Sequence, residues 1–465
     1  MKVSNTPAEQ INQLFISQKN FFNKEMTLTV GFRKKQLKLL LEAINQYEKE
    51  LSEAIWEDLH KSYEEFYLTE LSIVKSEIKE ALKNIRCWTK RERHKTPITL
   101  FGSRSYVVKE PLGCALIVAP WNYPVQLLLN PLVGAIAAGC TTILKPSPYV
   151  PNVSAVIGKM VKNIFPEEYI AVVQGNREVN KQLFSMSFDI IFFTGSPALA
   201  KQVAAAAAEN LVPLVLELGG KSPCIIDKSA NIKLAARRCA WGKTVNAGQT
   251  CVAPDYLLIH QEVKDEFIKE FALSISKLHG QEIKESGHYV RMVNDNAFER
   301  VSEYIGEGHI LYGGETDAAQ RFIEPTLIDD INDEAKVLHT EIFGPVFPVI
   351  TFDDNGSTFK DKVVKYITQR EKPLALYYFG DESVGWEIIR RTSAGGSCLN
   401  DTIMHVANAH LPFGGVGNSG MGHYHGKLSF DAFTHRRAII AAPTLFDLPF
   451  RYMPYKFFKL AKRFL

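Results

Sequence analysis

Residues 114–145 read CALIVAPWNYPVQLLLNPLVGAIAAGCTTILK, and the fold class follows from this segment. Its two ends, Cys114–Ala119 and Thr141–Leu144, are short apolar runs rich in branched side chains, which predicts two buried strands. Between them, Pro124–Ala138 is long and apolar enough for a buried helix. A strand, a helix and a second strand in one short stretch predict a parallel pair of strands joined by a helical crossover.

The same alternation continues on the C-terminal side. Three more apolar runs predict strands of this kind: Ile170–Gln174, Ile190–Phe193 and Leu214–Leu218. Ala198–Asn210 predicts a helix between two of them, and a second region after Gly220 repeats the pattern with a strand at Asp255–Ile259 and a helix at Val263–Leu278. Buried strands that alternate with helices predict an α/β protein with helices on both faces of a parallel sheet.

The N-terminal side is different in character. Up to about residue 85, apolar residues recur every three or four positions, which predicts amphipathic helices; the clearest series is Leu37, Leu40, Ile44, Tyr47, Leu51, Ile55 and Leu59. The segment Cys87–Pro111 then carries basic residues, a proline and the run Ser105–Lys109. This segment predicts an exposed hairpin rather than core.

Length and composition limit the class of protein. The chain has 465 residues, which predicts two or three domains. A net charge of +3 gives no electrostatic signal for nucleic acid, and no apolar run is long enough to span a membrane or to serve as a secretory signal. The seven cysteines include no C-x-x-C pair, which favours a reducing compartment over a disulfide framework or a metal site. We therefore expect a cytoplasmic protein.

A cysteine that ends the loop Asn246–Cys251 is the first candidate for chemistry. A thiolate attacks carbonyl carbon well, and Gly248 would let this loop approach a ligand closely. Taken alone, however, a cysteine is more often an inert packing residue.

Two polar residues follow predicted strands. Glu217 ends an apolar strand, where a raised pKa would suit a general base, although a strand-end glutamate paired with a nearby lysine is the simpler interpretation. Asn122 follows another strand, and its amide could stabilise an oxyanion, although it could equally form an Asx turn or a helix cap before Pro124.

Phosphate and ribose contacts are predicted at two further strand ends. Lys145 closes the strand that starts at Thr141, and Gly195-Ser196 opens a helix whose free N–H groups favour a diphosphate. Neither of these strand ends carries the glycine pattern G-x-G-x-x-G, so each motif alone is also compatible with simple strand-to-helix connection.

Together and in this order, the motifs resemble those of the aldehyde dehydrogenase superfamily, over roughly residues 30 to 440. The matching runs are Pro120-Trp121-Asn122, Lys145-Pro146-Ser147, Phe193-Thr194-Gly195-Ser196, Glu217–Lys221, Gly248–Cys251 and Glu341–Pro345. The later runs Pro412–Gly422, Tyr424–Lys427 and Phe433–Arg437 are similar to the class 3 branch, which includes fatty and aromatic aldehyde dehydrogenases.

The resemblance implies a role for each matching residue. Cys251 would attack the aldehyde to form a thiohemiacetal, with the oxyanion held by Asn122 and by the Cys251 N–H. After hydride transfer to NAD or NADP, Glu217 would activate water to hydrolyse the thioester to the acid. The implied cofactor contacts are Lys145 and Glu341 on the riboses, Phe343 and Trp121 around the nicotinamide, and Gly195 and Ser196 near the diphosphate.

The resemblance also implies the architecture. It predicts a Rossmann-type dinucleotide-binding domain over 1–85 and 108–219 and an α/β catalytic domain over 220–411. A small oligomerisation hairpin is expected from 86–107 together with 412–443, followed by a C-terminal tail over 444–465. It further implies a small-molecule aldehyde substrate of medium or long aliphatic chain, or an aromatic one, and a homodimer. No nucleic-acid partner and no metal site are expected.

Two residues depart from the family pattern. Pro148 stands where many members carry a glutamate that binds the adenosine ribose, so repulsion toward a 2′-phosphate is absent. This departure predicts that NADP is accepted at least comparably with NAD. Ala200 replaces a common second glycine and is expected to shift the backbone only slightly.

The last residues form a basic and aromatic tail. A helix over Lys456–Leu465 would gather Phe457, Leu460, Ala461, Phe464 and Leu465 on one face among lysines and an arginine. A basic amphipathic segment of this kind can lie in a membrane interface. Packing on the partner subunit, gating of the substrate funnel and fraying are the alternatives.

Two other functions remain open at this point. A semialdehyde dehydrogenase that transfers the acyl group to CoA would share most of these motifs, although Glu217 favours water as the acceptor. A non-catalytic protein on the same scaffold is the alternative from another class, because fold alone does not prove activity.

Overall fold

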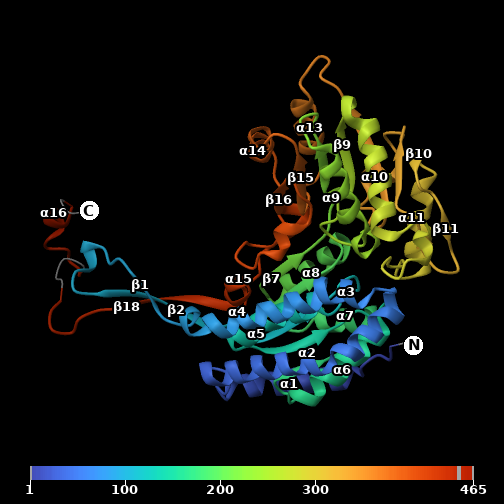
Figure 1. Ribbon diagram of the computed structural model, residues 1–465. Helices are drawn as coiled ribbons and strands as arrows, with labels where there is room; N and C mark the ends of the chain where they lie inside the picture. Colours follow the sequence, from blue (N-terminus) through green and yellow to red (C-terminus); the bar gives the residue numbers. More distant parts are fainter. Residues whose placement is uncertain (1–2, 448–451, 463–465) are drawn as a thin grey trace.

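The computed structural model of the chain describes residues 3–447 and 452–462. Two open sheets form its body, and a narrow third sheet projects from the body as an arm (Figure 1). We call them the first sheet (β17-β7-β6-β3-β4-β5), the second sheet (β10-β13-β14-β9-β8-β15-β16) and the arm (β1-β2-β18). The predicted α/β class with parallel sheets is confirmed.

The first sheet contains the five strands predicted from the sequence, all parallel. Their bounds are β3 Cys114–Val118, β4 Thr141–Lys145, β5 Ile170–Val172, β6 Ile190–Thr194 and β7 Leu214–Glu217. The predicted ends were wrong by one or two residues, as at Gln174 and Leu218. A short strand, β17 (Gly420–Met421), adds to the edge antiparallel to β7 and was not predicted.

Both faces of the first sheet are buried, which explains its continuous apolar strands. Ala115 and Ile117 pack in a cluster with helices on one face, whereas Leu116 and Val118 pack in a second cluster on the other. The first face is covered by α2 (Val30–Leu59), α5 (Gln126–Ala138) and α6 (Pro151–Ile164), and the second by α1 (Ala8–Asn23), α7 (Arg177–Phe184) and α8 (Pro197–Glu209).

The second sheet is parallel apart from one edge strand. Its strands are β8 Pro223–Ile226, β9 Tyr256–His260, β13 Thr326–Asp329, β14 Val346–Phe352, β15 Ala375–Phe379, β16 Gly396–Leu399 and the antiparallel β10 His309–Tyr312. The accompanying helices are α9 Ile232–Thr244, α10 Lys264–His279, α11 Asp295–Ile305, α12 Lys336–His339, α13 Phe359–Thr368 and α14 Glu382–Arg391. A small hairpin of β11 (Thr316–Asp317) and β12 (Phe322–Ile323) completes this half.

Helices form the N-terminal region, as predicted, but the connection after α2 is irregular. α2 ends at Leu59, and a single-turn α3 (Tyr63–Phe66) follows. The chain then forms a π-helix over Tyr67–Leu71 before α4 (Ser72–Trp88). Such π-helical turns are rare and often lie at functional sites.

The arm confirms the predicted hairpin. β1 (Glu92–His94) pairs antiparallel with β2 (Arg104–Pro111), and β18 (Thr434–Ala441) pairs with β2 along its whole length. α15 (Lys427–Ala432) packs on α5 and connects the arm to the body. Figure 1 shows the arm reaching away from both sheets, with the described part of the tail at its far end.

The tail differs from the predicted ten-residue helix. Within the described residues only Phe458–Ala461 is helical (α16), and the stretch from Tyr452 to Lys459 is exposed. Phe464 and Leu465 lie outside the described residues. Among the described residues, no helix combines the length and the apolar character that crossing a bilayer requires.

Candidate active site

Polar side chains gather where three neighbouring strands of the first sheet end. β3 leads into Pro120-Trp121-Asn122, β6 leads through Thr194 into Gly195-Ser196, and β7 ends at Glu217. The strand register places Thr194 beside Glu217. The carboxyl edge of an open parallel sheet is the usual place for a ligand.

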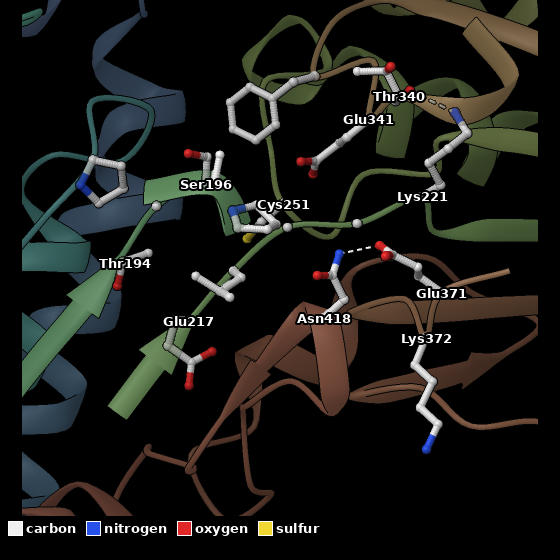
Figure 2. Close-up of a pocket in the computed structure, with 18 of the residues that line it drawn as sticks. Thr194, Ser196, Glu217, Lys221, Cys251, Thr340, Glu341, Glu371, Lys372 and Asn418 are labelled. Atoms are coloured by element: carbon white, nitrogen blue, oxygen red, sulfur yellow. Dashed lines mark hydrogen bonds between the residues drawn. The ribbon is translucent and has the colours of Figure 1, made fainter. Parts of the chain in front are cut away.

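A cavity of about 770 Å³ opens at this edge (Figure 2). Its walls come from the strand ends of the first sheet and from the second half of the chain, around Arg300, Glu341 and Lys372. Cys251, Glu217 and Asn122, which are far apart in the sequence, all line this one cavity. The structure therefore brings the three predicted catalytic side chains together.

The loop before Cys251 is held in a conformation that needs glycine. Gly248 has φ +71°, and a Cβ atom there would lie 2.4 Å from the Gly344 carbonyl oxygen. The need for glycine at this position therefore comes from a close backbone contact, and the close approach of the loop to a ligand stays a prediction. Gln249 is fully buried and fixes the loop: it accepts from the Val293 N–H (3.1 Å) and donates to the Arg291 carbonyl (3.1 Å).

Cys251 lines the cavity and is partly exposed as a residue. Burial among protein atoms, with the negative charges of Glu341 and Glu217 nearby, raises its pKa to about 12. The thiol is therefore protonated at neutral pH, and a base must remove its proton before it can attack.

Glu217 is 2% exposed, and neither carboxylate oxygen has a hydrogen-bond partner among the described residues. Burial alone raises its pKa well above the ordinary value. The simpler interpretation, a glutamate paired with a nearby lysine, does not hold: Lys221 pairs with Asp255 and donates to the Thr340 carbonyl at 3.0 Å. An unpaired buried carboxyl of this kind suits a proton acceptor near neutral pH.

Asn122 is likewise 2% exposed. Its Nδ2 donates to the Gln249 carbonyl at 3.0 Å, which leaves a second N–H of the same amide for another acceptor. The alternative of a helix cap does not apply, because α5 begins at Gln126 after Val125 and has no side-chain cap.

Most of the predicted cofactor residues line the cavity. Trp121 and Phe343 pack edge to face there, with ring centroids 5.4 Å apart and ring planes at 80°. Ser196 caps α8, so the N-terminus of this helix opens onto the cavity beside Gly195. Apolar rings and a helix N-terminus in one cavity fit a dinucleotide.

Glu341 lies against the backbone after β7. A Cβ atom at Gly219 would lie only 2.2 Å from a Glu341 carboxylate oxygen, so this contact requires glycine. Burial, with Asp255 adding negative charge, raises the pKa of Glu341 to about 8.

Lys145 is placed differently from the other predicted contacts. It does not line the cavity, and its ammonium donates to the neighbouring Pro146 carbonyl at 2.8 Å. Burial lowers its pKa to about 8. Its assignment to a ribose therefore stays a prediction.

Two features of the cavity were not predicted. Thr194 ends β6 with a buried hydroxyl that has no partner among the described residues, and its position directly before Gly195-Ser196 was the available signal. Figure 2 also shows Asn418 donating to Glu371 across the cavity wall. No spacing in the sequence links these two residues, so this contact could not be predicted.

Several known proteins are similar to this chain over nearly its whole length. A family model described as "Aldehyde dehydrogenase family" matches residues 1–439. The 4,4'-diaponeurosporen-aldehyde dehydrogenase of Staphylococcus aureus is 46% identical over 458 residues, which is 98% of this chain and 99% of that protein. The "aldehyde dehydrogenase, dimeric NADP-preferring" of Canis lupus familiaris is 39% identical over 93% of this chain and 95% of that protein. The solved structure of substrate-bound Staphylococcus aureus AldH has a TM-score of 0.95 at 45% identity, covering 98% of this chain and 99% of that one.

Proposed function

Because this chain belongs to the aldehyde dehydrogenase family, we propose that it oxidises an aldehyde to the carboxylic acid by covalent catalysis at Cys251. The cofactor is NAD or NADP. The observation that carries the proposed mechanism is the unpaired, buried carboxyl of Glu217 in the same cavity as the Cys251 thiol. A thiol nucleophile and a base that can take its proton are the two parts that thioester chemistry requires.

In the first half of the reaction, Glu217 takes the proton of the Cys251 thiol. The sulfur then attacks the carbonyl carbon of the aldehyde, so that a C–S bond forms and the carbonyl oxygen becomes an oxyanion. The Asn122 amide and the Cys251 backbone N–H donate to this oxygen. Fixed donors aimed at developing charge usually contribute most of the rate enhancement in such a step.

In the second half, the thioester on Cys251 is hydrolysed. When bound, the nicotinamide supplies the hydride acceptor that turns the thiohemiacetal into this thioester. Glu217 first releases the proton of the thiol to solvent and then takes a proton from water, so that the hydroxide oxygen attacks the thioester carbon. The C–S bond breaks to release the acid, and the departing sulfur takes the proton back from Glu217. The same oxyanion donors serve both halves, which is why one site performs both.

The cavity fits the cofactor on several grounds. The unpartnered Thr194 hydroxyl and the N-terminus of α8 provide donors for a diphosphate, and Trp121 and Phe343 provide an apolar wall. We assign Gly195 and Ser196 to the diphosphate, Phe343 and Trp121 to the nicotinamide side, and Glu341 and Lys145 to the riboses.

The proposed substrate is an aldehyde with a medium or long aliphatic chain, or an aromatic one. Its support is the likeness to a Staphylococcus aureus protein named for 4,4'-diaponeurosporen-aldehyde. The test is product analysis with decanal and benzaldehyde, with NAD or NADP, with and without CoA. We expect one equivalent of free acid per reduced cofactor in every case; an acyl-CoA product would show that the thioester passes to CoA instead of water.

Pro148 predicts broad cofactor use. It follows the end of β4, in the turn before α6, and brings no charge to the position where many family members carry a carboxylate. We expect kcat/KM for NADP to be at least comparable with that for NAD. Pro148→Glu should lower kcat/KM for NADP about tenfold through repulsion of the 2′-phosphate, and Pro148→Gln should not. A hundredfold preference of the unmodified protein for NAD would contradict this prediction.

We also propose a homodimer and the predicted division into domains. The arm projects from the body with Ile440 51% exposed on β18, and an exposed strand edge is usually covered in a native assembly. The relative from Canis lupus familiaris is named as dimeric. Sedimentation equilibrium should give twice the chain mass, and a monomer mass would contradict the proposal.

The described part of the tail supports a proposal of peripheral membrane contact from the cytoplasm. Met453, Tyr455 and Phe458 are exposed there beside Lys456 and Lys459. Exposed aromatic and basic residues together suit an anionic bilayer surface. We expect the full chain to co-sediment with anionic phospholipid vesicles more than a chain ending at Pro443. Equal soluble fractions would remove this proposal.

All seven cysteines are free thiols, which supports a reducing compartment.

A further inference from the structure

A buried ion pair stands behind the wall of the cavity that carries Asn122. The Nζ atom of Lys61 lies 2.9 Å from an Oε atom of Glu70, and both side chains are completely inaccessible to solvent. Neither residue lines the cavity. An ion pair of this kind adds little net stability, because desolvating two charges offsets their attraction. The role of the Lys61–Glu70 pair therefore depends on which groups its two side chains hold in place.

The local backbone conformation places both the Lys61 ammonium and the Glu70 carboxylate in the interior. α2 ends at Leu59, and His60 adopts a left-handed conformation (φ 57°) that turns the chain so that Lys61 is buried. Ser62 then caps α3. Glu70 belongs to the π-helix Tyr67–Leu71, whose wider turn shifts the following side chains relative to an α-helix.

The ion pair is bonded to the segment that carries the Asn122 amide. Lys61 Nζ donates to the Asn122 carbonyl at 3.0 Å and lies 4.3 Å from the centroid of the Tyr123 ring. The other carboxylate oxygen of Glu70 accepts from the Val125 N–H (2.9 Å) and the Gln126 N–H (3.2 Å). The pair thus fixes the chain from Asn122 to the first turn of α5.

The same N-terminal segment also reaches the nucleophile loop. A Glu65 carboxylate oxygen accepts from the Asn246 N–H at 2.8 Å, where the backbone is left-handed (φ 53°). Asn246 Nδ2 in turn donates to the Asn122 carbonyl at 3.1 Å and to the Gln249 carbonyl at 3.0 Å. The Asn122 carbonyl is therefore the point at which Lys61 and the nucleophile loop meet.

We propose that Lys61 and Glu70 are positioning residues for the Asn122 amide, holding it at the distance from Cys251 that the oxyanion requires. This inference rests on the proposed function of Asn122. Lys61 and Glu70 themselves contact neither substrate nor cofactor in this role. An error of about 1 Å in the place of a catalytic group can lower a rate about a hundredfold.

The first test is Lys61→Met, which keeps the length of the side chain and removes the donor to Asn122. We expect kcat with decanal to fall about tenfold to a hundredfold, and the dissociation constant of NADP to stay within twofold. Lys264→Met is the matched control, because Lys264 pairs with Asp329 at 2.6 Å and lies outside the cavity. It should leave kcat unchanged.

A double-mutant cycle distinguishes positioning from a general structural effect. If Lys61 acts through the amide, Lys61→Met should lower kcat when Asn122 is present but should lower it little further in the Asn122→Ala background. The same pattern is expected for the rate of acylation by 4-nitrophenyl acetate, which needs no cofactor. The variant Lys61→Met/Glu70→Gln, which removes both charges, should recover Tm but not kcat. Recovery of both would overturn the inference.

The outcomes also separate this inference from the proposed function. A normal rate for Asn122→Ala would show that the oxyanion assignment itself is wrong. A slow Asn122→Ala together with a normal, folded Lys61→Met would refute the positioning role alone. Additive losses in the cycle would do the same.

Discussion

Replacing Cys251 with alanine should reduce aldehyde-dependent formation of NADH or NADPH by about 10⁴-fold or more, because no covalent intermediate can then form. Cofactor binding should be unchanged, since the ring pair of Trp121 and Phe343 and the N-terminus of α8 do not depend on the thiol. Stopped-flow absorbance at 340 nm and cofactor titration measure the two quantities separately. Unchanged aldehyde-dependent reduction with normal cofactor binding would refute the mechanism.

The matched control for this prediction is Cys239→Ala. Cys239 is fully buried in the second half of the chain, and its sulfur lies 3.4 Å from that of Cys224. It does not line the cavity. We expect this variant to lose some stability through the small void that it leaves, and to keep kcat within about twofold. The comparison separates the chemistry of one thiol from the packing of another.

The fold could be predicted from the sequence because its signals are local. A strand buried on both faces, such as Cys114–Val118, has to be continuously apolar, and the connected helices follow at a fixed spacing. The tail shows where local signals fail. The periodicity of Lys456–Leu465 predicts a helix, but within the described part of that stretch only Phe458–Ala461 is helical. A local pattern of this kind does not ensure a helix, because short helices are marginal in water and depend on tertiary packing.

The candidate site was predictable for a different reason. Cys251, Glu217 and Asn122 lie in short motifs whose order is specific, and the parallel sheet gathers strand ends at one edge. The Lys61–Glu70 pair had no such signal. Its contact with Asn122 depends on the left-handed turn at His60 and on a π-helix, and neither has a pattern that separates it from the surrounding amphipathic helices.

Replacing Glu217 with glutamine should slow steady-state turnover about 10²- to 10⁴-fold, because the amide cannot accept a proton from water. Attack by Cys251 also loses its base, so the first turnover should slow as well. Once formed, the thioester should persist, since its hydrolysis has no other assigned base. Intact-protein mass spectrometry after mixing with decanal and NADP should show the acyl adduct on Cys251. Glu77→Gln is the matched control, because burial also raises the pKa of Glu77 but its contacts are with Gly426 and Ser429.

The pH dependence gives the same prediction a second readout. Burial raises the pKa of Glu217, so the carboxyl is protonated below that pKa and becomes a base only above it. Turnover of the unmodified protein should therefore rise with pH through a range well above that of an ordinary glutamate, and fall as the pH is lowered. In Glu217→Gln, the rate of adduct hydrolysis should no longer rise with pH. In Glu77→Gln, turnover should still rise with pH as it does in the unmodified protein. A pH profile of Glu217→Gln identical to that of the unmodified protein would show that another group is the base.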